Sequence, residues 1–240
     1  MKIYDATGVK DTPQIKVTKS VNAIIIATDK QPSELRDETI SIFIEKVNQP
    51  NFQIATAVPL IDFLMLTNYG SDAIQSDRDF QTVALCELAE DGALTLNEGE
   101  TLQIKLSGLN EANKYVMYAT EDANTVQHTH FIERKTIAQE DTVKTINVEN
   151  CDLCVIDLDP SVSELTFRYA NGNTTRFTPF ELKCISRDVD PVFSINREGA
   201  VSQGLDQKTS IPLIGVNEIE VVKTPGAMVT VSTRSEKPLN

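Results

Sequence analysis

The chain has 240 residues, of which 40% are hydrophobic and 24% are charged, so it is too apolar for an intrinsically disordered protein. Its formal net charge of −13 argues against tight binding to nucleic-acid phosphates, which needs clustered Lys and Arg. No apolar run approaches the roughly 18 residues of a membrane-spanning helix, and the first residues lack the apolar core of a signal peptide. We therefore expect neither secretion nor membrane insertion.

The first half of the chain is built from short extended segments. Residues 40–44 show a period of two, a polar turn follows at 48–51, and a second extended run spans 52–56. This order predicts a β-hairpin. Pro59 then opens a short apolar segment and suits the first position of a helix, where its missing N–H is no loss. The other strands of this half are expected at 15–17, 23–27, 83–88, 94–96, 102–106 and 115–118.

The second half restarts after a polar segment without periodicity at 121–127. Residues 165–169 alternate in the same way, Asn171-Gly172-Asn173 makes the turn, and Thr178 is the expected N-cap of a helix opened by Pro179. We expect residues 234–240 to be a mobile tail. The other strands are expected at 131–133, 143–148, 153–158, 192–195, 211–214, 219–222 and 228–231.

The second half thus repeats the layout of the first. Four landmarks keep their order, and the separation between partners only shrinks along the chain, as it would if each loop of the second copy were shorter. We infer a tandem duplication, with a first domain at 1–124 and a second at 125–240. The paired landmarks are Ile40 with Leu165, Pro59 with Pro179, Leu102 with Ile219, and Tyr118 with Val231.

The spacing of the strands sets the fold class. Each half offers seven or eight short strands about 8 to 12 residues apart, which is typical of a β-sandwich or barrel. Continuous helical periodicity is nearly absent. We therefore predict an all-β chain.

The residues that usually carry chemistry are scarce. His128 and His130 are the only histidines, and on an extended segment both would point to one side, where they could share a metal. No Cys or carboxylate is obliged to join them, so we interpret them as part of a solvated junction. No glycine-rich phosphate loop and no Gly-x-Ser-x-Gly elbow occurs. We predict no catalytic, cofactor-binding or metal-binding residue.

The cysteines and aspartates have structural interpretations. Cys151 and Cys154 have the spacing of redox and zinc motifs, but positions i and i+3 of a strand face opposite ways. We expect all four cysteines, including Cys86 and Cys184, to be small buried residues in a reducing compartment. Aspartates cluster in loops, either as solvated turns or, as a hypothesis, as calcium ligands at subunit contacts. They are Asp72, Asp77, Asp79, Asp157, Asp159, Asp188 and Asp190.

The repeated unit of strand, turn, strand and proline-opened helix, at residues 40–64 and 165–182, resembles the double jelly-roll capsid proteins of tailless icosahedral phages and related viruses. The resemblance covers nearly the whole chain as layout and has no fixed motif. It implies two tandem eight-stranded jelly-roll β-sandwiches with short helices in the loops. Members often carry a terminal helix or basic arm, which neither 1–10 nor 234–240 supplies.

The same resemblance implies a function. The chain would be a major capsid subunit of an icosahedral virion, made in the host cytoplasm, that forms homotrimeric, pseudo-hexagonal capsomers and contacts neighbouring capsomers. Other capsid or membrane-associated virion proteins are further partners, whereas no cofactor and no sequence-specific nucleic-acid binding are expected. The alternative is a tandem β-sandwich adhesin, spike or carbohydrate-binding protein. A jelly-roll hydrolase or oxygenase would need converging acids or a His-rich metal site, and two histidines make the oxygenase a poor fit.

Overall fold

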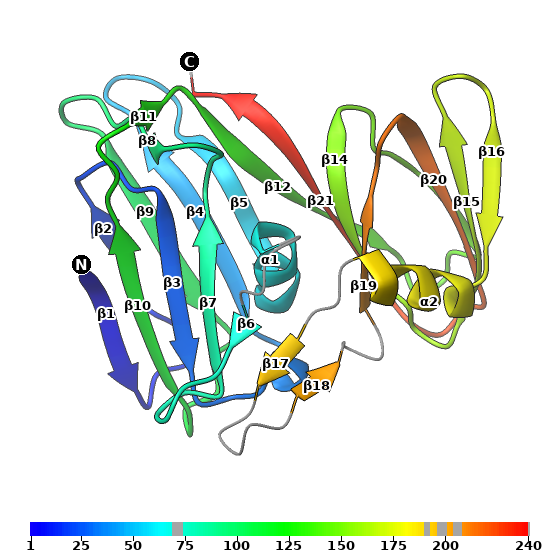
Figure 1. The fold of residues 1–240 in the computed structure, drawn as a ribbon, viewed down its shortest axis with the longest axis horizontal. Coiled ribbons are helices and arrows are strands. Elements are labelled where there is room, and N and C mark those ends of the chain that lie inside the picture. Colours follow the sequence, from blue (N-terminus) through cyan, green and yellow to red (C-terminus); the bar gives the residue numbers. More distant parts are fainter. Residues whose placement is uncertain (69–73, 190–192, 196–200, 204–207, 240) are drawn as a thin grey trace.

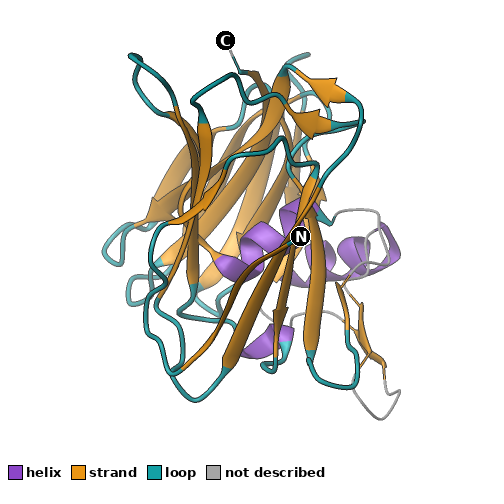
Figure 2. Ribbon diagram, turned by 90° about the vertical axis from the view of Figure 1, so that its left-hand side faces the viewer, coloured by secondary structure: helices purple, strands orange, loops and turns teal. Residues whose placement is uncertain are grey.

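The computed structural model describes residues 1–68, 74–189, 193–195, 201–203 and 208–239. Strands form most of the described chain, and the helices are short (Figures 1 and 2). The predicted all-β fold class is therefore confirmed. Neither described α-helix is long and apolar enough to cross a lipid bilayer.

The first half of the chain is a sandwich of two antiparallel layers. One layer has the strand order β1-β10-β3-β7-β6, and the other has the order β5-β4-β9-β2. Alternate side chains of both layers point inward and form one hydrophobic core. The strands are β1 (Lys2–Thr7), β2 (Ile15–Val17), β3 (Ala23–Thr28), β4 (Thr39–Glu45), β5 (Phe52–Pro59), β6 (Ile74–Gln75), β7 (Thr82–Glu87), β9 (Thr101–Ser107) and β10 (Lys114–Thr120).

The second half forms a second sandwich with its own core. Its layers have the orders β12-β21-β14-β19 and β13-β20-β15-β16. The strands are β12 (His128–Ile137), β13 (Val143–Asn147), β14 (Cys151–Asp157), β15 (Val162–Tyr169), β16 (Thr174–Phe177), β19 (Lys208–Pro212), β20 (Val216–Lys223) and β21 (Val229–Pro238).

Short elements complete the chain. A 3-10 turn, η1 (Pro32–Glu34), precedes β4, and α2 (Pro179–Val189) follows β16. Near the junction of the halves, β8 (Ala93–Leu94) pairs in parallel with β11 (Thr125–Val126). The last pair, β17 (Phe193–Ile195) with β18 (Val201–Gln203), comes from the second half, and β17 contacts β6 of the first.

The two sandwiches have the same topology. In the first sandwich, the hairpin β4–β5 is extended by β9 and then by β2. In the second, the hairpin β15–β16 is extended in the same way by β20 and then by β13. In the opposite layer, β10 lies between β1 and β3 just as β21 lies between β12 and β14. A parallel bridge from Ala55 of β5 to Ile132 of β12 joins one layer of each half into a single eight-stranded sheet. The fold is therefore two tandem jelly-roll sandwiches, as predicted.

The strand registers correct some of the predicted residue equivalences. Met117 of β10 and Val231 of β21 both point into their cores, whereas Tyr118 is only half-buried. Because side chains alternate across a strand, the equivalent of Val231 is Met117 rather than Tyr118. Periodicity identified the repeat correctly but left its register uncertain by a residue or two.

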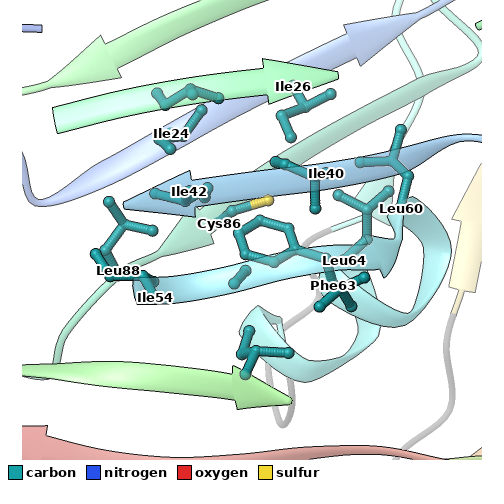
Figure 3. Close-up of a cluster of buried hydrophobic side chains, with 14 of the residues drawn as sticks. Ile24, Ile26, Ile40, Ile42, Ile54, Leu60, Phe63, Leu64, Cys86 and Leu88 are labelled. Atoms are coloured by element: carbon teal, nitrogen blue, oxygen red, sulfur yellow. The ribbon is translucent and has the colours of Figure 1, made fainter. Parts of the chain in front are cut away.

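The helix α1 (Leu60–Thr67) lies at the centre of the molecule, and all eight of its side chains are buried. Phe63 and Leu64 pack against Ile40 and Ile42 of β4 and against Cys86 of β7 (Figure 3). The predicted helix is present, although Pro59 lies at its N-cap rather than at its first position. A helix that is apolar on every side must be covered on every side.

Two expectations for the ends of the chain differ from the structure. The predicted mobile tail at 234–240 is wrong as far as the structure describes it, because residues up to Pro238 belong to β21 and Leu239 is buried. The strand β1 was not predicted at all. Both segments are polar and lack clear alternation, and they become strands because β10, β12 and β14 offer hydrogen-bonding edges to them.

Candidate functional site

One buried carboxylate lies where α1 meets the second sandwich. Asp62, in the first turn of α1, is fully buried. The Lys208 ammonium of β19 lies 2.8 Å from its Oδ1 atom, and the Ser232 hydroxyl of β21 donates a 2.7 Å hydrogen bond to Oδ2. One carboxylate of the first half thus has a charged partner and a hydroxyl donor that both come from the second half. Sequence reasoning missed it, because a single aspartate in an apolar segment carries no pattern.

The C-terminal end of α1 is also held by β21 of the second half. The Arg234 guanidinium donates a 2.7 Å hydrogen bond to the Leu66 carbonyl and a 2.9 Å bond to Asp152. Beside these contacts, Leu153 and Val155 of β14 pack into the core of the first sandwich. The outward face of the layer β14-β21 therefore covers α1, and we call this contact the α1 joint.

A second buried ion pair fixes the start of α1. The Glu38 carboxylate is held by the Lys30 ammonium at 2.5 Å and by the Tyr115 hydroxyl at 3.0 Å. Its backbone carbonyl accepts a 2.8 Å hydrogen bond from the Leu60 amide. Burial, aided by the nearby Glu38 charge, raises the pKa of Tyr115, so that its hydroxyl stays protonated and donates.

The helix α2 occupies in the second half the place of α1 in the first, but among its described side chains, at 179–185, only Leu182 is buried. Leu182 is buried in the second core, whereas Phe180 is 75% exposed and Ile185 is 45% exposed. The predicted N-cap is confirmed: the Thr178 amide donates a 2.7 Å hydrogen bond to Glu181, and the Glu181 amide donates one of 3.3 Å to the Thr178 hydroxyl.

An apolar groove of about 250 Å³ runs beside α2. It lies between the helix, the hairpin β15–β16 and the end of β19, and aliphatic and aromatic side chains dominate its walls. Ile214, on its rim, is 85% exposed. The lining includes Phe167, Tyr169, Phe177, Leu182, Ile185 and Ile214.

The two histidines have different surroundings. His128 makes a 3.0 Å contact with Glu236, but His130 is buried, which corrects the expectation of a solvated segment. Burial, and then the positive charge of Arg234, lower the pKa of His130 and favour the neutral ring. Among the residues that the structure describes, no three His, Cys, Asp or Glu side chains are placed to hold a metal ion.

The cysteines only partly follow the prediction. Cys86 and Cys154 are buried as expected, but Cys151 is only half-buried and Cys184 is exposed. A β-bulge between Cys151 and Leu153 adds a residue to β14, so Cys151 and Cys154 pack against the same core rather than facing opposite ways. Burial raises the pKa of Cys86 to about 12, which makes this thiol unreactive.

The aspartate loops that the structure describes are organised by their own backbones. Asp77 accepts hydrogen bonds from the amides of Asp79 and Phe80 at 2.7 and 2.8 Å, and Asp159 accepts one of 2.8 Å from Ser161. These are turn-stabilising bonds. Asp72 and Asp190 lie outside the described residues, so calcium binding stays a prediction.

Two solved structures of viral proteins are similar to this chain over nearly its whole length. The major capsid protein of bacteriophage PM2 is similar over 100% of this chain and 95% of its own, with a TM-score of 0.56 and 8% identity. The chain has a double jelly-roll fold. A chain in the atomic structure of Sulfolobus turreted icosahedral virus is similar over 98% of this chain and 90% of its own, with a TM-score of 0.53 and 7% identity. No protein-family model and no curated protein sequence matches this double jelly-roll chain.

Proposed function

We propose that this double jelly-roll chain is a structural subunit of a virion, the major capsid protein of an icosahedral shell. The observation that carries the proposal is that one order of strands recurs in both halves of a single chain, with β6 as the one addition in the first half. The full-length similarity to the capsid protein of bacteriophage PM2 supports it. The two jelly rolls would span residues 1–124 and 125–240, with the change of half just before β12.

The finer proposal is that three chains form a capsomer. Two similar sandwiches per chain give a homotrimer six similar sectors, so one building block can pack into a roughly hexagonal lattice. The partners are then the two other chains of the trimer and the neighbouring capsomers. A shell subunit works through its contact surfaces rather than through a reaction centre, so the proposed function involves neither catalysis nor a cofactor.

The test is the oligomeric state of the purified chain, measured by size-exclusion chromatography with light scattering over a hundredfold range of concentration. We expect a species of three times the 26.5 kDa chain mass. Negative-stain electron microscopy of concentrated trimers is expected to show hexagonal outlines, sheets or shells. A chain that stays monomeric throughout would refute the capsomer and favour the adhesin or spike alternative.

A further inference from the structure

The two halves of the chain differ in what covers their helices. Counted from the first residue of each helix, Asp62 of α1 corresponds to Glu181 of α2, and Leu66 corresponds to Ile185. Asp62 and the Leu66 carbonyl both bind side chains of β21 at the α1 joint. Glu181 and Ile185 are exposed. The face of α2 that corresponds to the joint is therefore open to solvent.

The surface that covers α1 also has a counterpart. Val155 of β14, with its neighbours Ser232 and Ser210, forms a row across the outward face of the second sandwich. The corresponding row of the first sandwich has Ile25 of β3 between Tyr118 of β10 and Leu85 of β7. It is more apolar, and Leu85 is 41% exposed. We call Ile25, Leu85 and Tyr118 the outer row.

The edges of the sheets show the same difference between a contact made within the chain and its unfilled counterpart. Within the chain, β5 of the first sandwich pairs with β12 of the second. Their counterparts are β16 and β1, and among the strands that the structure describes each of these has a neighbour on one side only. An apolar helix face, an apolar row and two unpaired edges are thus left over in the positions that one more copy of the internal contact would fill.

We propose that α2 of one chain docks on the outer row of a second chain, with β16 beside β1 of that chain, so that the contact between chains repeats the contact between halves. The inference rests on the proposed capsid function and supplies the surfaces that would hold the capsomer together. The α2 surface consists of Phe180, Glu181, Ile185 and Ile214 together with the groove beside them.

The arrangement of the two surfaces fits a ring. The strands β1, β10 and β3 lie at one end of the molecule and α2 at the other (Figure 1). A contact between two different patches is heterologous, and it closes into a ring when the rotation from copy to copy is a whole fraction of a turn. In a ring of three chains, the α1 joint within each chain would alternate with the proposed contact between chains. The ring would then have six similar contacts.

Cross-linking tests the proposed pairing directly. Because the Ser232 hydroxyl lies 2.7 Å from Asp62, the corresponding residues, Tyr118 of one chain and Glu181 of the next, should be close. In a background with Cys184→Ser, which removes an exposed thiol, the double variant Tyr118→Cys with Glu181→Cys is treated with a short bis-maleimide. We expect covalent dimers and trimers on denaturing gels. Each single-cysteine variant should give no such species.

Charge insertion tests the contribution of the surfaces to assembly. Phe180→Asp and Leu85→Asp are each expected to lower the trimer fraction at least tenfold at the wild-type dissociation midpoint, since each places a charge in an apolar contact. Met228→Asp is the matched control, because Met228 is 54% exposed and belongs to neither surface. Far-UV circular dichroism verifies that each variant is folded.

The outcomes separate the docking contact from the capsid function. A wild-type trimer that gives no cross-link and survives Phe180→Asp would overturn the contact and leave the function standing. A wild-type chain that is monomeric at all concentrations would overturn both. A trimer with specific cross-links, lost with Phe180→Asp and kept with Met228→Asp, supports both.

Discussion

The ion pair of the α1 joint gives the sharpest test of how the two sandwiches are held together. Lys208→Met would leave Asp62 fully buried with the Ser232 hydroxyl as its partner. Breaking a buried pair by removing one charge typically costs about 3–5 kcal/mol. The Lys208 side chain is 18% exposed, so water partly replaces it, and we expect a loss of about 3 kcal/mol in the free energy of unfolding.

Urea denaturation followed by far-UV circular dichroism measures this loss. With a slope of roughly 3 kcal/mol per molar urea, the midpoint should fall by about 1 M. The double variant Asp62→Leu with Lys208→Met removes both charges and should recover most of the loss. As a control, Lys16→Met breaks the exposed contact with Glu45 and should cost less than about 0.5 kcal/mol. If Lys208→Met costs no more than Lys16→Met, the buried pair does not hold the joint.

Three further predictions follow from burial. Phe63→Ala should lower the free energy of unfolding by about 3–5 kcal/mol in urea titrations, because it leaves a cavity beside α1. Wild-type stability should decrease as the pH is lowered below about 6.5, the pKa of an unfolded histidine. The reason is that unfolded His130 takes up a proton that the folded, buried ring, with its lowered pKa, binds less readily. The variant His130→Gln should lose this component of the pH dependence. Ellman's reagent should label Cys184 in the native chain and Cys86 only in denaturant, and rapid native labelling of Cys86 would contradict its burial.

The local parts of the fold could be predicted from the sequence. The period of two at residues 40–44 and 165–169, the turns that follow and the Thr178 cap all act over a few residues, so the amino acids themselves carry the signal. The repeat was visible because these local units recur in the same order. The exact register was not, because residues 115–118 form an apolar run without alternation, which leaves open whether Met117 or Tyr118 faces the core.

The missed features depend on contacts between distant residues. The strand β1 and the last part of β21, from residue 234 on, are polar, and their pairing is decided by the edges that other strands offer. The burial of His130 and Asp62 depends on the packing of one sandwich against the other, which no local pattern encodes. The candidate docking surface could not be predicted from the sequence either. The exposure of Phe180 on α2 gains meaning only from the comparison with α1, whose side chains are all buried.

The position of β21 has a consequence for how the chain folds. It is the last strand of the described chain in sequence, yet it lies between β12 and β14 and supplies Ser232 and Arg234 to the first half. During synthesis, the second sandwich must wait for this strand, and until then Asp62 has no hydroxyl partner and α1 keeps an uncovered flank. A chain without β21 would thus leave the hydrophobic seam between its halves open, so docking of the two sandwiches depends on the insertion of this one strand.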